Sequence, residues 1–195
     1  MSLVLASGSA VRARLLRDAG LVFAVRPGAV DEAAVKQEYR AAGKSASDLA
    51  LALAEAKASA DCRAGETVIG ADSVLVCGDD WFDKPADRAA ARLHLQAMRG
   101  RAHQMVSAVA VARNGAVAWR HVETVTLVMR QLDDAFIDDY LARAGDAVLS
   151  SVGAYQIEAL GVTLFERVDG DYFSVLGLPL LPLLGFLRQH AMAPA

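Results

Sequence analysis

The 195-residue sequence has little cysteine, little histidine and no excess of positive charge. Its two cysteines, Cys62 and Cys77, fit no metal-ligand spacing, so we expect two reduced thiols in a cytoplasmic protein. The four histidines are equally scattered, which argues against a zinc site. With a net charge of −3, the chain lacks the surplus of Lys and Arg that neutralises the phosphates of duplex nucleic acid.

Long hydrophobic runs are also absent. The N-terminal stretch LVLASGSA has a short apolar run, but no basic region precedes it, so we do not expect a signal peptide. The apolar tail at 176–187 spans about twelve residues and contains two prolines, whereas a membrane span needs about twenty residues. We therefore expect a core-facing loop followed by a terminal helix.

The composition that remains is typical of a soluble, core-forming protein, with 54% hydrophobic and 22% charged residues. We predict a single α/β domain over 1–195, because expected strands and helices alternate along the chain. The Asn114-Gly115 pair is a strong hairpin signal, which makes the sheet mixed rather than purely parallel. Strands are expected at 3–6, 22–26, 67–76 (interrupted at 70–72), 104–112, 121–129 and 162–168. Helices are expected at 11–19, 45–60, 88–98, 134–144 and 180–190.

The stretch Ser7-Gly8-Ser9 separates the first expected strand from the first expected helix. Small residues there leave backbone N–H groups uncovered at a helix N-terminus, and Ser7, Ser9 and Arg12 add further donors. These features favour a phosphate site. The alternative is a turn in which Ser9 caps the helix and Arg12 is solvated. The stretch matches neither a Walker loop nor a GxGxxG fingerprint, which argues against a dinucleotide-dependent oxidoreductase.

Asp72 is a carboxylate within an apolar, β-branched stretch. Burial of an unpaired charge is costly, so Asp72 either faces a cleft, as a Mg²⁺ ligand or a base, or lies in a turn after Gly70. Lys57 and Lys84 are either solvated or charge partners for a polyphosphate. We expect His103 to be structural rather than catalytic.

Eight segments of the sequence, taken in their order along the chain, carry a resemblance to a known family. They are VLASGSAVRARLL, VDE at 30–32, LALAEAKA, IGADSVLV, DKP at 83–85, MRGRAHQMVSAVAV, GAYQIEALG and VDGDYFSVLGLPLLPLL. From Val4 to about Leu187 the sequence therefore resembles the Maf family. The resemblance implies a fold similar to the inosine triphosphatase-type pyrophosphatases, with a long mixed sheet, flanking helices and two lobes around a nucleotide-binding cleft.

The resemblance also implies an enzyme that hydrolyses nucleoside triphosphates to the monophosphate and pyrophosphate, with Mg²⁺ or Mn²⁺ as cofactor and a house-cleaning role. Asp72 matches the catalytic aspartate, as proton acceptor or as metal ligand, and Glu32 matches an acidic residue that would share the metal. The catalytic residues implied are Asp72, Lys84 and Glu32. The substrate-binding residues implied are Ser7, Ser9, Arg12 and Lys57.

Three positions that follow base specificity in the family depart from its usual pattern. Val11 replaces an arginine, Ser73 a threonine, and Glu158 the glutamine of members specific for dTTP and UTP. The branch that acts on 7-methyl-GTP also has an acid at the position of Glu158, but it has an aromatic residue and a glutamine at the other two. A carboxylate accepts hydrogen bonds from a guanine-like N1–H and amine. We therefore predict broad or purine-leaning specificity that includes modified nucleotides.

A second hypothesis is a nucleotide-binding regulator of cell division that acts through a protein partner, because the family was first described as septum-formation inhibitors. Asp72, Lys84 and Glu32 in matching context favour the enzyme, since a binding protein need not keep them. We expect neither nucleic acid nor a membrane as partner. Homodimers are common in the family, so the resemblance allows one here.

Overall fold

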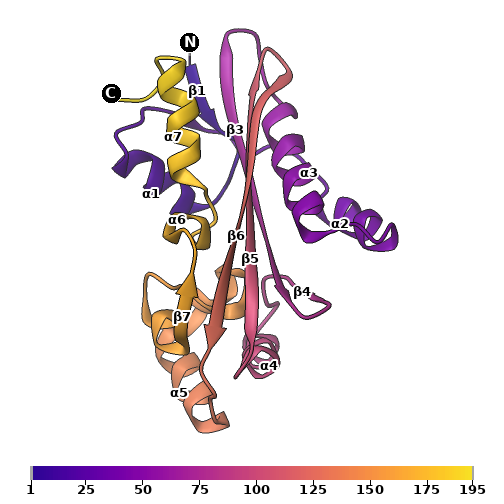
Figure 1. Cartoon of the computed structure of the whole chain (residues 1–195), viewed down its shortest axis with the longest axis vertical. Coiled ribbons are helices and arrows are strands. Elements are labelled where there is room, and N and C mark those ends of the chain that lie inside the picture. The colour runs from indigo at the N-terminus through magenta and orange to yellow at the C-terminus, as the bar shows by residue number, and fades with distance from the viewer. Residues whose placement is uncertain (1, 195) are drawn as a thin grey trace. The chain divides into compact units, whose positions relative to one another are not determined.

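The computed structural model describes residues 2–194 and confirms an α/β fold built on a seven-stranded mixed sheet. By its internal contacts the chain divides into two compact units. The first comprises the described residues up to Ser73, Val106–Glu123 and the residues from Asp171 onward, and the second comprises Val74–Met105 and Thr124–Gly170. Figure 1 labels the elements of both units.

The sheet has the strand order β2-β1-β3-β5-β6-β7, and β4 pairs with β3 off this path. Strand β1 runs parallel to β2 and β3, whereas the pairs β3–β4 and β6–β7 are antiparallel. Asn114 and Gly115 both have positive φ angles and form the two-residue turn between β5 and β6, as predicted. The strands are β1 (Ser2–Leu5), β2 (Ala24–Val25), β3 (Glu66–Cys77), β4 (Asp80–Phe82), β5 (Ala102–Arg113), β6 (Ala116–Met129) and β7 (Phe165–Asp169).

All five predicted helices are present, and the structure adds α2 and the four-residue α6, which were not predicted. The helices are α1 (Ala10–Asp18), α2 (Glu32–Ala41), α3 (Ala46–Ser59), α4 (Arg88–Met98), α5 (Asp134–Ala144), α6 (Tyr172–Val175) and α7 (Leu180–Gln189). Short 3₁₀ helices occupy Gly145–Ser150, Val152–Ala154 and Leu160–Leu164, so the strand expected at 162–168 begins later than predicted. Within 2–194, no helix has both the length and the apolar character needed to cross a membrane. Cys62 and Cys77 are free, as expected.

The predicted interruption of the third strand at Gly70–Asp72 is wrong, since β3 continues without a break through these residues. Gly70 is instead the point at which helix α3 lies directly against the strand. A Cβ atom on Gly70 would lie 2.2 Å from the carbonyl oxygen of Ala54 and 2.4 Å from the amide nitrogen of Ala58. The glycine therefore allows a close backbone approach rather than a turn.

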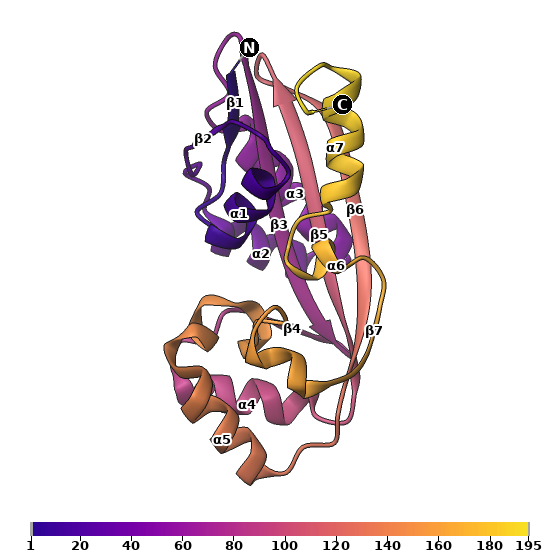
Figure 2. The ribbon, with the colours of Figure 1, turned by 90° about the vertical axis from the view of Figure 1, so that its left-hand side faces the viewer.

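The two faces of the sheet in the first unit carry alternate residues of β1 and β3. Leu5 and Ile69 pack on one face with Leu16 of α1 and Leu183 of α7. The opposite face of β3 contains Gly70 and contacts α3, so that α1 lies in front of the strands and α3 behind them in Figure 2. By the same alternation, Asp72 faces the α3 side.

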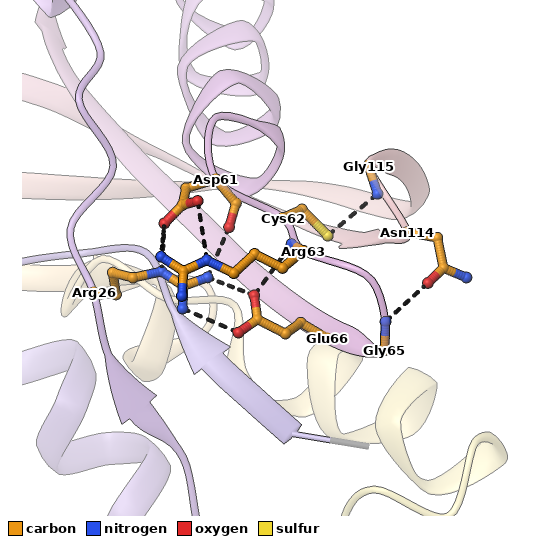
Figure 3. Close-up of polar contacts among 8 residues, drawn as sticks. All are labelled: Arg26, Asp61, Cys62, Arg63, Gly65, Glu66, Asn114 and Gly115. Carbon is orange, nitrogen blue, oxygen red and sulfur yellow. Dashed lines mark hydrogen bonds and ion pairs between the residues drawn. The ribbon is translucent and has the colours of Figure 1, made fainter.

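An ionic cluster joins the chain after β2 to the start of β3 (Figure 3). Arg26 donates from Nη1 to Oε1 of Glu66 at 3.0 Å, and its Nε lies 2.8 Å from Oδ2 of Asp61. The Arg26 guanidinium lowers the pKa of the Glu66 carboxyl to about 2. Asn114 in the β5–β6 turn accepts a hydrogen bond from the Gly65 amide at 3.2 Å. These contacts hold together the end of the sheet at which strands β1 and β3 begin.

His103 on β5 is buried in the second unit, with 2% of its surface exposed, in agreement with the structural role predicted for it. Its Nε2 lies 3.1 Å from the hydroxyl of Tyr155. Burial lowers the pKa of His103 to about 4, because an imidazolium is poorly solvated there. Between that pKa and the ordinary value near 6.5, the unfolded chain binds a proton that the folded chain does not.

The folded state should therefore lose stability as the pH falls from about 6.5 to about 4, by up to about 3 kcal/mol. We expect His103→Gln, which keeps a polar partner for Tyr155, to remove most of this dependence when urea unfolding is compared at pH 4.5 and pH 7. His190→Gln alters an exposed histidine and serves as the control. An unchanged difference between the two pH values in His103→Gln would contradict the assignment.

Candidate functional site

The structure brings most of the predicted site residues together in the first unit. These are Ser7, Ser9, Val11, Arg12, Glu32, Lys57, Asp72 and Ser73. Lys84 and Glu158 belong to the second unit. Lys84 is exposed in the loop after β4, and Glu158 is half-buried between the 3₁₀ helices Val152–Ala154 and Leu160–Leu164.

The parallel pairing of β1 and β3 determines where these residues meet. Leu5, the last residue of β1, pairs with Ile69, and the Ala6 amide donates to the Ile69 carbonyl oxygen at 2.8 Å. Strand β3 continues beyond this point, so Asp72 lies next to the turn that follows β1. The carboxyl ends of parallel strands are the usual place for a ligand in open α/β sheets.

Lys57 joins two carboxylates at this position. Its Nζ lies 2.6 Å from Oδ1 of Asp72 and 2.6 Å from Oε1 of Glu32. Asp72 is 8% exposed and Lys57 9% exposed, whereas Glu32 is at the solvent-exposed start of α2. Asp72 is therefore not a turn residue and Lys57 is not a solvated cation. Each buried charge has an opposite charge as partner, which offsets the cost of removing it from water.

Local sequence explains why these three side chains converge. Helix α3 begins with a capping box formed by Ser45 and Asp48, and Lys57 lies in its last turn, where a positive charge is favoured. Glu32 lies in the first turn of α2, where a negative charge is favoured. The close approach of α3 at Gly70 then brings Lys57 to the face of β3 that carries Asp72.

The turn after β1 combines features of both alternatives considered for Ser7-Gly8-Ser9. Ser9 is the N-cap of α1, and its Oγ accepts a hydrogen bond from the Arg12 amide at 3.3 Å. Ser7 is 6% exposed, and its Oγ accepts from the Ser9 amide at 3.3 Å and from Nη1 of Arg12 at 3.2 Å. Arg12 itself is half-buried, so the solvated arginine of the second alternative is wrong.

The guanidinium of Arg12 binds several groups around the turn. Nη1 donates to the Ala71 carbonyl oxygen at 2.8 Å, Nη2 to Ser73 Oγ at 3.1 Å, and Nε to the Gly177 carbonyl oxygen at 2.8 Å. Burial lowers the pKa of Arg12 from its ordinary value, and the carboxylates of Asp72 and Glu32 counteract this shift. Arginine nevertheless remains protonated in proteins, so Arg12 contributes a full positive charge.

Sequence reasoning missed several residues behind this site. Ser107 on β5 is completely buried, and its Oγ donates to the Ser174 carbonyl oxygen at 2.7 Å and lies 2.9 Å from Ser73 Oγ. A serine in an otherwise apolar strand must find a hydrogen-bond partner, and this was the available signal. Gly177 was also missed, although its carbonyl oxygen binds Arg12.

The donor set fits the divalent cation that the resemblance implies. Two carboxylates from different elements, Asp72 and Glu32, each lie 2.6 Å from the Lys57 ammonium, so both face the same positive charge. Among the described residues, no group of three or more His, Cys, Asp or Glu side chains is placed to hold a metal ion. Mg²⁺ in nucleotide-dependent enzymes typically takes one or two carboxylates and completes its shell with phosphate oxygens and water.

Comparison with known proteins shows the family of this chain. A family model described as Maf-like protein matches residues 2–190. The chain belongs to the Maf-like family. Among its relatives, a nucleoside triphosphate pyrophosphatase of Granulibacter bethesdensis is 50% identical over 192 residues, which cover 97% of this chain and 98% of the relative. The 7-methyl-GTP pyrophosphatases of Rhizobium meliloti and Brucella suis are each 49% identical, over 96% and 97% of this chain and 95% and 96% of their own.

Proposed function

We propose that this chain is a nucleoside triphosphate pyrophosphatase, which converts a nucleoside triphosphate to the monophosphate and pyrophosphate. The observation that carries the proposal is the convergence of Asp72, Lys57 and Glu32 beside the serine turn at the N-terminus of α1. Relatives of this chain at about half identity and nearly full length bear the names of such enzymes, which supports the same reaction here.

The charges of the site favour a substrate that arrives with a metal ion. Arg12 and Lys57 formally balance Asp72 and Glu32, so the site has little surplus positive charge for a triphosphate. A divalent cation, Mg²⁺ or Mn²⁺, would be held by Asp72 and Glu32 and would neutralise charge on the phosphates. Lys84, which the resemblance implies as a catalytic residue, is an exposed cation of the second unit.

The chain's own residues supply binding and proton transfer. The N-terminus of α1, with Ser7 and Ser9, binds phosphate oxygens through N–H and O–H donors. Asp72 accepts a proton from the water that attacks the α-phosphorus. A bond forms between the water oxygen and that phosphorus, and the bond to the oxygen bridging to the β-phosphorus breaks, so that pyrophosphate leaves.

The residues at the three base-selecting positions support broad or purine-leaning specificity. Val11 and Ser73 replace the residues of members specific for dTTP and UTP, and Glu158 offers only acceptors to a base. Guanine presents an N1–H and an amino group as donors, whereas thymine and uracil present only one ring N–H on that edge. We extend the proposal to modified purine nucleotides and a house-cleaning role.

The test is a panel of canonical nucleoside triphosphates together with 7-methyl-GTP, each incubated with the protein and Mg²⁺ or Mn²⁺. We expect equal amounts of pyrophosphate and monophosphate, no release without the metal ion, and purine nucleotides turned over at least as fast as pyrimidines. Turnover of dTTP and UTP far above every purine would overturn the specificity. Absence of pyrophosphate release over the whole panel would overturn the activity.

A further inference from the structure

We infer that Arg12 is a positioning residue that acts through Ser7, rather than a phosphate ligand. This inference rests on the proposed function, because it describes how the same site binds its substrate. It follows from three observations. They are the groups that accept hydrogen bonds from the Arg12 guanidinium, the hydrogen bonds that Ser7 accepts, and the packing of Ser73, Ser107 and Gly177 around Arg12.

The donors of Arg12 are largely used within the protein. At least four of its five N–H hydrogens are taken by acceptors in the first unit, which come from the turn after β1, from both sides of Asp72 on β3, and from the loop before α7. A side chain held at so many points lacks the freedom to reach a phosphate. It can, however, fix the position of each group that it touches.

Ser7 is the residue through which Arg12 affects substrate binding. Its Oγ accepts hydrogen bonds from the Ser9 amide and from Nη1 of Arg12, and these two bonds occupy both lone pairs of the hydroxyl. Ser7 can therefore interact with a further group only as a donor. Because phosphate oxygens are acceptors, Arg12 holds Ser7 in the one state that matches a polyphosphate.

The residues packed around Arg12 fix the donor and acceptor roles in its hydrogen bond to Ser73. Ser107 uses its proton for the Ser174 carbonyl oxygen, so Ser73 must donate to Ser107 and accept from Arg12. A Cβ atom on Gly177, where φ is +91°, would lie 3.1 Å from Ser73 Oγ and 3.3 Å from Nη2 of Arg12. The space thus fits a planar guanidinium, and a lysine ammonium cannot reproduce its several fixed directions.

The experiment is a double-mutant cycle of Arg12→Lys and Ser7→Ala. It measures kcat/KM for the best nucleotide of the panel and, by calorimetry, the affinity for inorganic tripolyphosphate. If Arg12 acts through Ser7, Arg12→Lys lowers both quantities about tenfold despite the retained charge, and Ser7→Ala does the same. The double variant is then no weaker than about the weaker single variant. Arg14→Lys, an exposed arginine on the same helix, is the matched control.

Two results would overturn the inference: full binding and activity of Arg12→Lys, or losses that multiply in the double variant. Thermal unfolding of each variant ensures that only folded protein is compared. The affinity for tripolyphosphate, measured by calorimetry, separates this inference from the proposed function. Coupled losses of tripolyphosphate affinity in a protein without hydrolytic activity would retain the positioning role and reject the enzyme. A wild-type protein that neither binds tripolyphosphate nor hydrolyses nucleotides would reject both.

Discussion

Replacement of Asp72 by asparagine is expected to lower kcat for pyrophosphate release by roughly 100- to 10,000-fold, the usual contribution of a positioned acid or base. Asparagine keeps the size of the side chain but does not accept a proton from water. The fold should survive the change, because Lys57 retains Glu32 as a charge partner and the asparagine amide oxygen can still accept from Nζ. The measurement is the rate of pyrophosphate release at saturating nucleotide and metal ion.

The control for this variant is Asp18→Asn, which alters an exposed aspartate at the end of α1. Activity of Asp72→Asn within a few fold of the wild type would contradict the assigned role. A titration with Mn²⁺ separates the two functions proposed for the carboxylate. If Asp72 mainly holds the metal ion, a higher Mn²⁺ concentration restores part of the rate, whereas a missing proton acceptor is not replaced in this way.

The elements that carry strong local signals could be predicted from the sequence. Asn114-Gly115 forms the hairpin turn as expected, and Ser9 caps α1 as one of the two alternatives had it. The helices expected at 88–98 and 134–144 are present, with Asp87 and Asp133 as their N-caps. These predictions succeed because each depends on side chain and backbone groups within a few residues of one another. For Asp72 the sequence left two alternatives open, a cleft-facing carboxylate or a turn residue, and the continuous strand β3 decides against the turn.

The contacts that assemble the site could not be predicted in this way. Helix α2 was missed, and none of its residues is buried. The proximity of Glu32 to Lys57 depends on this helix. Arg12 and Gly177 are 165 positions apart in the chain, and no local pattern connects them. A buried position such as Ser107 looks like any small residue of an apolar strand until its partners are known.

Gly70→Ala is the second substitution from which we expect a large effect, because it acts on the spacing between α3 and β3. The added Cβ meets backbone atoms of Ala54 and Ala58, which cannot move as a flexible side chain does. Helix α3 must therefore shift as a whole. We expect a loss of about 1–3 kcal/mol in the free energy of unfolding, or more, measured by urea denaturation.

The same shift should lower activity beyond what the loss of stability explains, because α3 carries Lys57 and β3 carries Asp72, whose charged atoms are 2.6 Å apart. Activity is therefore compared at a temperature at which the variant is folded by circular dichroism. Gly185→Ala on α7 is the matched control, since its added Cβ would have no atom within 4 Å beyond its chain neighbours and the backbone of its own helix, and alanine favours a helix. A stable and fully active Gly70→Ala would show that the ion pair tolerates a displaced helix. Loss of activity in the folded variant, with Gly185→Ala unaffected, would mean that a strand glycine sets the distance between the lysine and the aspartate of the site.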